Sequence, residues 1–240
     1  MTGRLHSIET LGALDGPGLR AVVFLQGCPL RCQYCHNPDT WDLAGGTELS
    51  AVALVARVCR LRPYFGEHGG VTLSGGEPLA QPQFAAEVLR LCRAQGLHTA
   101  LDTSGACPGP AAAEVLRHTD LVILDLKGTD PEQYRALTGG ELSRTWEFLR
   151  QVTAAGVALW VRQVVVPGWN DTEADARRLG EALRGLPTLE RIELLPYHTL
   201  GLSKWERLGL RSPLADRPAA DPEHVARLER CARASAGNHA

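Results

Sequence analysis

Apolar and polar residues alternate along this chain in blocks that predict strands followed by helices. Short runs rich in Val, Ile and Leu have the length and composition of buried strands; they lie at Leu19–Leu25, Val71–Leu73, His98–Leu101, Leu121–Leu126, Val157–Val166 and Arg191–Leu195. Stretches with helical spacing separate or follow them, at Ser50–Arg60, Gln83–Ala94, Ala111–Arg117, Thr145–Ala154, Thr172–Leu183 and Pro222–Ser235. Near-continuous apolar strands separated by helices indicate a parallel sheet covered on both faces.

This order of elements predicts an α/β fold, a partial (β/α)6 barrel of parallel strands with outer helices. Six units are too few for a closed eight-stranded barrel. A flat doubly wound sheet is the alternative, but no Walker or G-x-G-x-x-G phosphate loop follows the first strand. The 240 residues show no internal linker or repeat, so we expect a single domain over residues 1–240. Within it we distinguish a cysteine-containing loop at 26–41 and a tail at 206–240 that lacks clear motifs.

Three cysteines, Cys28, Cys32 and Cys35, lie in one short loop after the first predicted strand. Their C-x3-C-x2-C spacing supplies three thiolates and leaves a fourth coordination position open. A structural zinc site would need a second ligand pair further along, which the sequence lacks. The Cys32–His36 segment reads C-x-x-C-H, as in c-type haem attachment, but that attachment follows export. An iron–sulfur cluster is the remaining interpretation, and it leaves one iron free to hold a substrate or cofactor.

Composition and charge weigh against several classes of function. The formal charge of −2, from 25 basic and 27 acidic residues, gives no reason to expect a nucleic-acid or membrane partner. No apolar run reaches the ~18 residues of a membrane span, and Met1–Glu9 lacks the apolar core of a signal peptide. An odd total of seven cysteines argues against a disulfide framework, so we expect a cytoplasmic protein.

Polar residues follow the predicted strands at the ends where an α/β barrel keeps its active site. The second strand ends in Ser74–Glu77, the third in Asp102–Gly105, the fourth in Asp125–Lys127 and the sixth in Pro196–His198. Period-two alternation places Asp125 and Lys127 on one face, where two buried charges are costly unless they serve a site or each other. A simple ion pair explains these two residues equally well, but the convergence of five strand ends on one rim favours a functional site.

These residues resemble the radical S-adenosylmethionine superfamily and, within it, the glycyl-radical enzyme activases that act on pyruvate formate-lyase. The superfamily pattern is the three-cysteine loop with an aromatic residue, Tyr34, before its last cysteine, together with Gly-Gly-Glu at Gly75–Glu77. The narrower match to the activases runs from about Gly3 to Trp205; it comprises Gly3–Glu9, Asp15–Arg20, Gln26–Trp41, Leu101–Gly105, Asp120–Lys127, Val164–Trp169 and Glu193–Gly201.

The resemblance implies that Cys28, Cys32 and Cys35 hold a [4Fe–4S] cluster whose free iron chelates S-adenosylmethionine. Reductive cleavage of that cofactor yields a 5′-deoxyadenosyl radical, which abstracts hydrogen from a glycine Cα of the lyase. Glycines in the Gly-Gly-Glu motif allow the backbone to approach the cofactor closely. The cofactor contacts that the resemblance implies are Tyr34, His36, Gly75, Gly76, Asp125, Leu126, Lys127 and His198.

The resemblance also implies a monovalent cation, Na⁺ or K⁺, held by Asp102, Thr103 and Asp125. The expected partner is a glycyl-radical lyase, pyruvate formate-lyase, with flavodoxin or ferredoxin as electron donor, and the chain is expected to act as a monomer. We predict that Asp15, Gly16 and the segment after Pro167 help to receive the lyase loop that carries the glycine, because they have no evident role at the cluster.

The likeness ends near Trp205, and the tail, including Leu210–Leu214 and the last residues 237–240, carries no clear motif. No insert with extra cysteine clusters precedes Gly75, which favours pyruvate formate-lyase as partner but leaves a different glycyl-radical enzyme open. Two further alternatives are a radical S-adenosylmethionine enzyme acting on a small molecule, such as a deazaguanine-forming synthase, and a zinc-stabilised binding module without catalysis.

Overall fold

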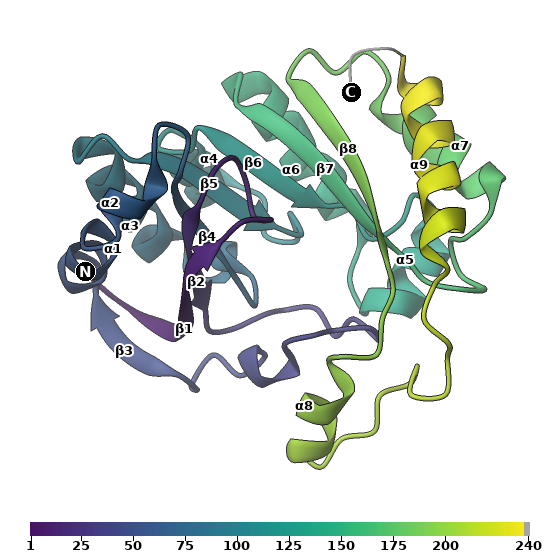
Figure 1. Cartoon of the computed structure of the whole chain (residues 1–240), viewed down its shortest axis with the longest axis horizontal. Helices are drawn as coiled ribbons and strands as arrows, with labels where there is room; N and C mark the ends of the chain where they lie inside the picture. Colours follow the sequence, from purple (N-terminus) through teal and green to yellow (C-terminus); the bar gives the residue numbers. More distant parts are fainter. Residues whose placement is uncertain (238–240) are drawn as a thin grey trace.

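One eight-stranded sheet organises the computed structural model, which describes residues 1–237 (Figure 1). The strand order is β3-β1-β2-β4-β5-β6-β7-β8. Six of these strands are mutually parallel, β2 (Arg20–Leu25), β4 (Gly70–Gly75), β5 (His98–Thr103), β6 (Leu121–Asp125), β7 (Ala158–Val165) and β8 (Leu189–Pro196). They confirm the predicted partial (β/α)6 barrel, whose sheet stays open. Residues 238–240 of the tail and of the predicted 1–240 domain lie outside the described residues.

Two antiparallel strands extend the β2 edge and were not predicted. β1 (Thr2–Gly12) pairs with β2, and β3 (Thr47–Ser50) pairs with β1. β1 is rich in polar residues and largely exposed towards its end, so its sequence lacks the apolar run by which the six buried strands are recognised. Together the two strands cover an edge of the parallel sheet that would otherwise present unpaired backbone groups.

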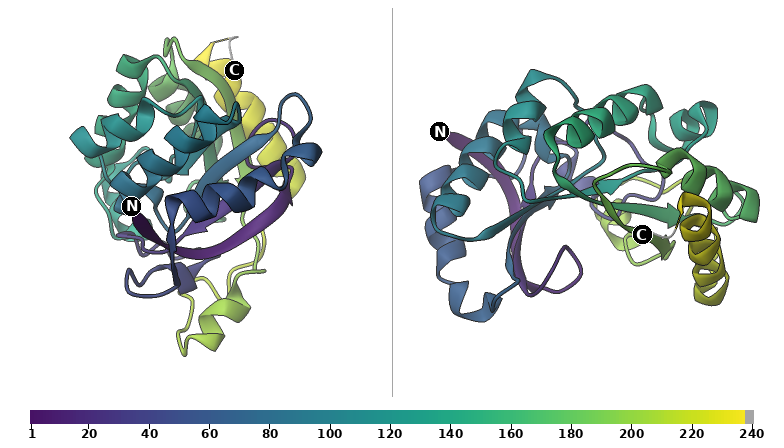
Figure 2. Two further views of the ribbon diagram at one scale, coloured as in Figure 1. Left: turned by 90° about the vertical axis from the view of Figure 1, so that its left-hand side faces the viewer. Right: turned by 90° about the horizontal axis from the view of Figure 1, so that it is seen from above.

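Most of the helices lie along the outside of the curved sheet, whereas α8 lies below it (Figure 2). The helices are α1 (Ala51–Cys59), α2 (Arg62–Phe65), α3 (Pro82–Ala94), α4 (Pro110–Leu116), α5 (Pro131–Thr138), α6 (Leu142–Ala155), α7 (Glu173–Leu183), α8 (Leu202–Arg207) and α9 (Pro222–Ala236), with 3-10 turns η1 (Pro38–Thr40) and η2 (Pro78–Ala80). The six predicted helices are confirmed, whereas α2 and α8 are too short to show a helical period. None of the helices in residues 1–237 combines the length and apolar character that crossing a membrane requires.

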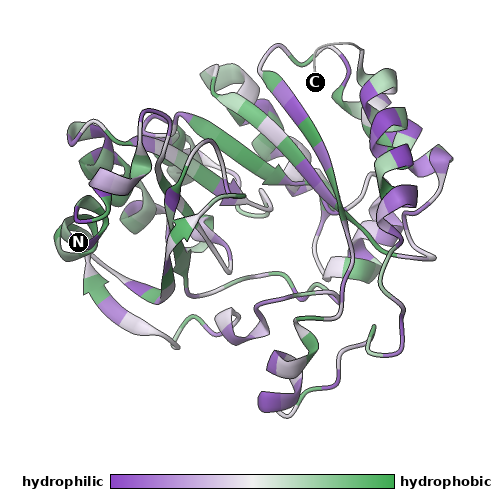
Figure 3. Cartoon of the chain, in the orientation of Figure 1, coloured by the Kyte–Doolittle hydropathy of each residue, from purple (hydrophilic) through white to green (hydrophobic). Residues whose placement is uncertain are grey.

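The two faces of the parallel strands have different chemistry. Side chains such as Leu101 and Leu124 belong to the large core beneath the helices and are fully buried, and β6 is drawn mostly in hydrophobic colours in Figure 3. The alternate residues Ala100, Leu121 and Ile123 form a second, small apolar cluster. Because side chains alternate along a strand, the polar Asp102 and Asp125 share the face of this second cluster. The inner face of the barrel is therefore apolar at its floor and polar at the carboxyl ends of its strands.

A fully buried arginine closes the amino-terminal end of the barrel. Arg20 Nε donates to Thr72 Oγ1 at 2.7 Å, and its Nη1 and Nη2 donate to the carbonyls of Pro17 and Val71, both at 2.8 Å. Burial lowers the pKa of Arg20 to about 10. Since Thr72 in turn donates to the Asp15 carbonyl at 2.6 Å, this arginine ties the β1–β2 loop to the interior of the barrel.

Candidate active site

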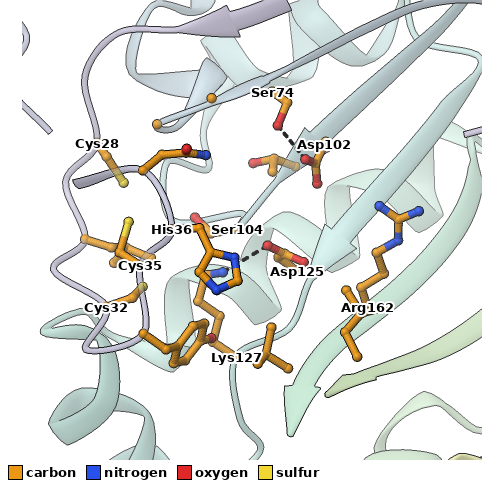
Figure 4. Close-up of a pocket in the computed structure, with 18 of the residues that line it drawn as sticks. Cys28, Cys32, Cys35, His36, Ser74, Asp102, Ser104, Asp125, Lys127 and Arg162 are labelled. Atoms are coloured by element: carbon orange, nitrogen blue, oxygen red, sulfur yellow. Dashed lines mark hydrogen bonds and ion pairs between the residues drawn. The ribbon is translucent and has the colours of Figure 1, made fainter. Parts of the chain in front are cut away.

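A cavity of about 310 Å³ opens at the carboxyl ends of the parallel strands (Figure 4). All but one of the site residues predicted from the sequence line it, namely Cys28, Cys32, Tyr34, Cys35, His36, Gly75, Gly76, Asp102, Thr103, Asp125, Lys127 and His198. The exception is Leu126, whose side chain is fully buried and whose N–H donates to the Arg162 carbonyl at 2.9 Å. The structure therefore brings these predicted residues together from five separate segments of the chain.

The cysteine loop forms one wall of this cavity. It leaves β2 at Gly27, whose N–H donates to the Thr40 carbonyl at 2.6 Å, and it is supported from α5 by the carbonyls of Leu137 and Thr138. Figure 4 shows the three cysteine side chains along this wall, facing Asp102 and Asp125 across the cavity. Three sulfur ligands on one side leave the opposite side open to a further ligand.

Burial keeps these thiols protonated when no metal is bound. Burial raises the pKa of Cys28 strongly, with a further contribution from the Glu77 carboxylate, and it raises the pKa of Cys32 to about 12. Burial also raises the pKa of Cys35, against hydrogen bonds from the Asn37 backbone and the Trp41 side chain. Because the thiolate is the metal ligand, uptake of a metal centre here is coupled to the release of protons.

The donor set fits a cluster better than a single ion. Within residues 1–237, no three His, Cys, Asp or Glu side chains converge closely enough to hold one metal ion. Three separated thiols instead suit a wider body such as an iron–sulfur cube, in which each sulfur binds a different iron. This arrangement disfavours the structural zinc interpretation.

The Gly75–Gly76 corner lies against the start of the cysteine loop. Gly75 has φ +117°, a conformation that favours glycine. A Cβ on Gly76 would lie 2.3 Å from the Gly27 carbonyl oxygen. Gly75 is therefore required by its backbone conformation, and Gly76 is required by close packing against the Gly27 backbone.

Asp125 and Lys127 form an ion pair on the cavity wall. The sequence analysis gave such a pair as the alternative to a functional role. Lys127 Nζ donates to Asp125 Oδ2 at 3.0 Å and lies 5.6 Å from the centre of the Tyr34 ring. Burial opposes the charge on Lys127, but the Asp125 carboxylate outweighs it, and the pKa of Lys127 is raised well above its ordinary value. Both residues also line the cavity, so the ion pair does not exclude a functional role.

Two histidines from distant segments stack on each other beside the cavity. The rings of His36 and His198 lie 4.1 Å apart with 24° between their planes. Burial, and then the neighbouring His198 ring, lower the pKa of His36. His198 Nδ1 is buried and has no hydrogen-bond partner among residues 1–237. A buried polar atom of this kind on a cavity wall fits a bound ligand that completes its hydrogen bonding.

Asp102 lies on the opposite wall, next to Thr103. Asp102 Oδ2 accepts from Ser74 Oγ at 2.6 Å, and Thr103 Oγ1 donates to Glu77 Oε1 at 2.6 Å. Burial, and then the charge of Asp125, raise the pKa of Asp102 to about 7. A carboxylate disfavoured by burial and by another carboxylate is a suitable ligand for a hard cation.

Glu77 of the Gly-Gly-Glu motif does not face the cavity. Its carboxylate is fully buried and accepts four hydrogen bonds, from Leu79 N–H at 3.0 Å, Thr103 Oγ1 at 2.6 Å, Ser104 N–H at 2.9 Å and Ser104 Oγ at 2.5 Å. Its own N–H donates to the Gly27 carbonyl at 2.8 Å. Glu77 thus joins the ends of β4 and β5 to the cysteine loop.

Arg162 is a cavity residue that the sequence analysis missed. It projects from β7, pairs with Glu193 at 2.7 Å and Asp15 at 3.8 Å, and also donates to the Leu14 carbonyl. Burial opposes its charge, but Asp102 and Glu193 outweigh this and raise the pKa of Arg162. The sequence did offer a signal for Arg162, since it is the only charged residue in the apolar run 157–166. Asp125 was recognised in its own strand by the same kind of signal.

Comparisons with known proteins agree with this geometry. The sequence pattern of the Radical SAM superfamily matches residues 22–179. A pyruvate formate-lyase-activating enzyme of Clostridium pasteurianum is 49% identical over 229 residues, which is 95% of this chain and 96% of that protein. The namesake of Staphylococcus aureus is 42% identical over 233 residues, 94% of this chain and 93% of its own length.

A solved radical SAM methyltransferase from Sphaerobacter thermophilus has the same fold. It superposes with a TM-score of 0.66 and 21% sequence identity, over 90% of this chain and 64% of that protein. At this level of identity, the likeness concerns the arrangement of strands and helices alone.

Proposed function

The chain belongs to the radical S-adenosylmethionine superfamily and, within it, to the family of pyruvate formate-lyase-activating enzymes, and from this premise we propose that it generates a glycyl radical on a pyruvate formate-lyase. The observation that carries the proposal is the gathering of three cysteines on one wall of a cavity whose other walls are strand ends bearing Asp102, Asp125 and Lys127. When bound, the cluster and S-adenosylmethionine supply one-electron cleavage of the sulfonium to a 5′-deoxyadenosyl radical that abstracts a glycine Cα hydrogen.

In this proposal Cys28, Cys32 and Cys35 hold the [4Fe–4S] cluster. Their loop is anchored by backbone hydrogen bonds at Gly27, Arg31 and Gln33, which supports three ligands held in place before the cluster binds. The raised pKa values of the thiols indicate that they lose their protons only as metal binds. The reducing cytoplasm is the proposed location, since all seven cysteines are free thiols.

The opposite walls would hold S-adenosylmethionine. Its methionyl ammonium and carboxylate are opposite charges, and the Asp125–Lys127 pair presents a matching carboxylate and ammonium. Gly75 and Gly76 keep that corner free of side chains, and His198 Nδ1 is a buried atom without a protein partner. Tyr34 and His36 complete the lining next to the cysteines. Leu126, with its side chain buried outside the cavity, would contribute through its position in the backbone.

A monovalent cation at Asp102, Thr103 and Asp125 is part of the proposal. Burial, and then the charge of Asp125, raise the pKa of Asp102 against the charge of Arg162, and a cation at this position would stabilise the ionised carboxylate. Thr103 Oγ1 donates to Glu77 and accepts from the Gly105 N–H on the face of β5 opposite to Asp102, so Thr103 would contribute to the site through its backbone. Na⁺ or K⁺ would be held by oxygen atoms alone, as hard cations prefer.

The proposal also includes a surface that receives the protein partner. Asp15 lines the cavity, and Gly16 follows it on the loop held by hydrogen bonds from Arg20 and Arg162, which supports a role for this loop in receiving the glycine-bearing segment. Three further parts of the proposal are kept from the sequence analysis. They are a role for the segment after Pro167 in receiving the lyase loop, flavodoxin or ferredoxin as electron donor, and action as a monomer.

Anaerobic spectroscopy tests the proposal. The chain is reconstituted with iron and sulfide, reduced, and mixed with S-adenosylmethionine and a pyruvate formate-lyase, and the electron paramagnetic resonance spectrum is recorded. We expect a glycyl-radical doublet with wild-type protein and with Cys59→Ala, a control cysteine outside the cavity, and none with Cys32→Ala. A reduced-cluster signal that responds to S-adenosylmethionine without any glycyl radical would redirect the search to another lyase or a small molecule. A chain that binds zinc but no iron would overturn the proposal.

A further inference from the structure

The chain returns to the cysteine loop after its last strand. Beyond β8 it forms α8, which packs beside η1 at the lower edge of the molecule in Figure 1. Farther along, Ser212 Oγ donates to the Gln33 carbonyl at 3.3 Å. The tail then reaches α9, which packs against α7 and β8. The chain beyond the motif Glu193–Gly201 thus lies against the loop that carries the three cysteines.

Two adjacent side chains of α8 contact consecutive parts of that loop. Trp205 is 6% exposed, and its Nε1–H donates to the Cys35 carbonyl at 2.8 Å. Lys204 Nζ donates to Asn37 Oδ1 at 2.7 Å and lies 3.3 Å from Asp39 Oδ2. Together they restrain the loop at its last cysteine and in the turn that follows it.

The turn before α8 lies equally close to the loop. A Cβ placed on Gly201 would lie 2.9 Å from the His36 Cα. Glycine here allows the backbone of residue 201 to pack directly on the residue after Cys35. The contact of α8 with the loop is therefore part of the close packing of the fold.

A second tryptophan links α8 to the cysteine side chains. Trp41 meets Trp205 edge to face with ring centres 5.1 Å apart, and the Trp41 side chain is among the groups that lower the pKa of Cys35 against burial. The Arg31 guanidinium lies 5.0 Å from the centre of the Trp41 ring and donates to the Cys28 carbonyl at 2.7 Å. The first and last cysteines of the loop are thus connected through Arg31, Trp41 and Trp205.

We propose that α8 is a clamp for the iron–sulfur cluster, in which Trp205 and Lys204 are positioning residues that hold Cys35 and the Asn37–Asp39 turn in the geometry that retains the cluster. This inference rests on the proposed cluster at Cys28, Cys32 and Cys35. Groups that orient metal ligands commonly change metal affinity by about tenfold or more when removed. A loop that carries three ligands needs such support, because loops hold geometry less well than helices and strands.

The test measures how fast the reconstituted cluster is lost to an iron chelator under anaerobic conditions, followed by its visible absorption. We expect Trp205→Phe and Lys204→Met to lose the cluster about tenfold faster than wild type. Lys204→Arg keeps the positive charge and is expected to behave as wild type. We also expect Trp205→Phe to alter the electron paramagnetic resonance spectrum of the reduced cluster, which a merely structural role would leave unchanged.

Trp160→Phe is the matched control. Trp160 also donates its Nε1–H, to Glu190 Oε2 at 3.2 Å, but it lies on β7 and makes no hydrogen bond to the cysteine loop within residues 1–237. The thermal midpoints of cluster-free Trp205→Phe and Trp160→Phe are compared first. A much lower thermal midpoint for Trp205→Phe alone would mean that Trp205 stabilises the fold as a whole, and this would overturn the clamp.

The outcomes separate this inference from the proposed function. Iron and sulfide are first measured in the wild-type protein, and a chain without about four of each would overturn the proposed function and the clamp together. A wild-type protein with a full cluster, together with Trp205→Phe and Lys204→Met variants that lose it at the wild-type rate, would overturn the clamp alone.

Discussion

Asp102 and Asp125 lie on neighbouring strands and face the same cavity, and the charge of Asp125 adds to burial in raising the pKa of Asp102 to about 7. Two carboxylates on one wall are costly without a compensating positive charge. Arg162 supplies part of that charge from β7. The cavity is therefore built with an excess of negative charge next to the neutral thiols.

The first prediction concerns the pH dependence of the cofactor-free protein. The ordinary pKa of an aspartate is 3.8 and that of Asp102 is about 7, so between these values the folded chain binds more protons than the unfolded chain. The contribution of Asp102 to stability is therefore complete below pH 3.8 and is lost as the pH rises to about 7, by at most about 1.4 kcal/mol per pH unit. Thermal unfolding of Asp102→Asn from pH 5 to 8 should show a weaker decline than wild type. Asp216→Asn, an exposed control, should retain the full decline.

The second prediction concerns the proposed cation. At pH 8, K⁺ or Na⁺ should raise the thermal midpoint of the wild-type protein more than tetramethylammonium does at equal ionic strength, because only a small cation fits between the oxygens. The difference should disappear in Asp102→Asn. Equal effects of all three cations on the wild-type protein would argue against a site at Asp102, Thr103 and Asp125.

Arg162 is the subject of the third prediction. Removal of its guanidinium leaves Asp15 without its ion-pair partner and leaves Glu193 with Arg191 alone, in a largely buried site. We expect Arg162→Met to lower the free energy of unfolding by about 3 kcal/mol, because one member of a buried ion pair is left uncompensated. Urea unfolding of the cofactor-free protein measures this. Arg177→Met, which breaks an exposed pair with Glu173, should change it by less than about 1 kcal/mol.

The fourth prediction concerns Glu77. Replacement by Gln puts an amide NH₂ where the carboxylate accepted hydrogen bonds from donors, so at least one of the donors on Thr103 or Ser104 is left unsatisfied. We expect Glu77→Gln to lose about 2 kcal/mol of stability and to retain less iron after reconstitution, because a shift of residue 77 would displace its backbone N–H, which donates to the Gly27 carbonyl at the start of the cysteine loop. Glu87→Gln, on the exposed side of α3, serves as the control. Wild-type iron content in Glu77→Gln would contradict the positioning role.

The fifth prediction concerns Gly76. An alanine Cβ there would collide with the Gly27 backbone, and displacement of the loop should cost about 2 kcal/mol and reduce cluster uptake. Gly128→Ala is a matched control, since its nearest atoms would lie 3.9 Å from the new Cβ. Analysis of iron per chain after reconstitution distinguishes the two variants.

The sequence predicts the parallel part of the fold well. The six buried strands are confirmed because Val, Ile and Leu run continuously through them, as full burial on both faces requires. It also brings the cysteines, Gly75, Gly76, Asp125 and His198 to one site, because the carboxyl ends of parallel strands share one edge of the sheet. It misses β1 and β3, whose polar, half-exposed residues lack a strand-like apolar pattern.

What the sequence by itself determined is the local chemistry of this protein: the three-cysteine spacing, the alternation that pairs Asp125 with Lys127, and the strand and helix periods. Only the tertiary structure decided which distant groups complete the site. Arg162 reaches Leu14 and Asp15 across more than 140 positions, and Trp205 reaches Cys35 across 170. Such contacts leave no local pattern, because they depend on how the strands curve and on where the chain returns after β8. The support of the cysteine loop therefore depends on the folded barrel, whereas the spacing of the three cysteines is set by one short segment of the sequence.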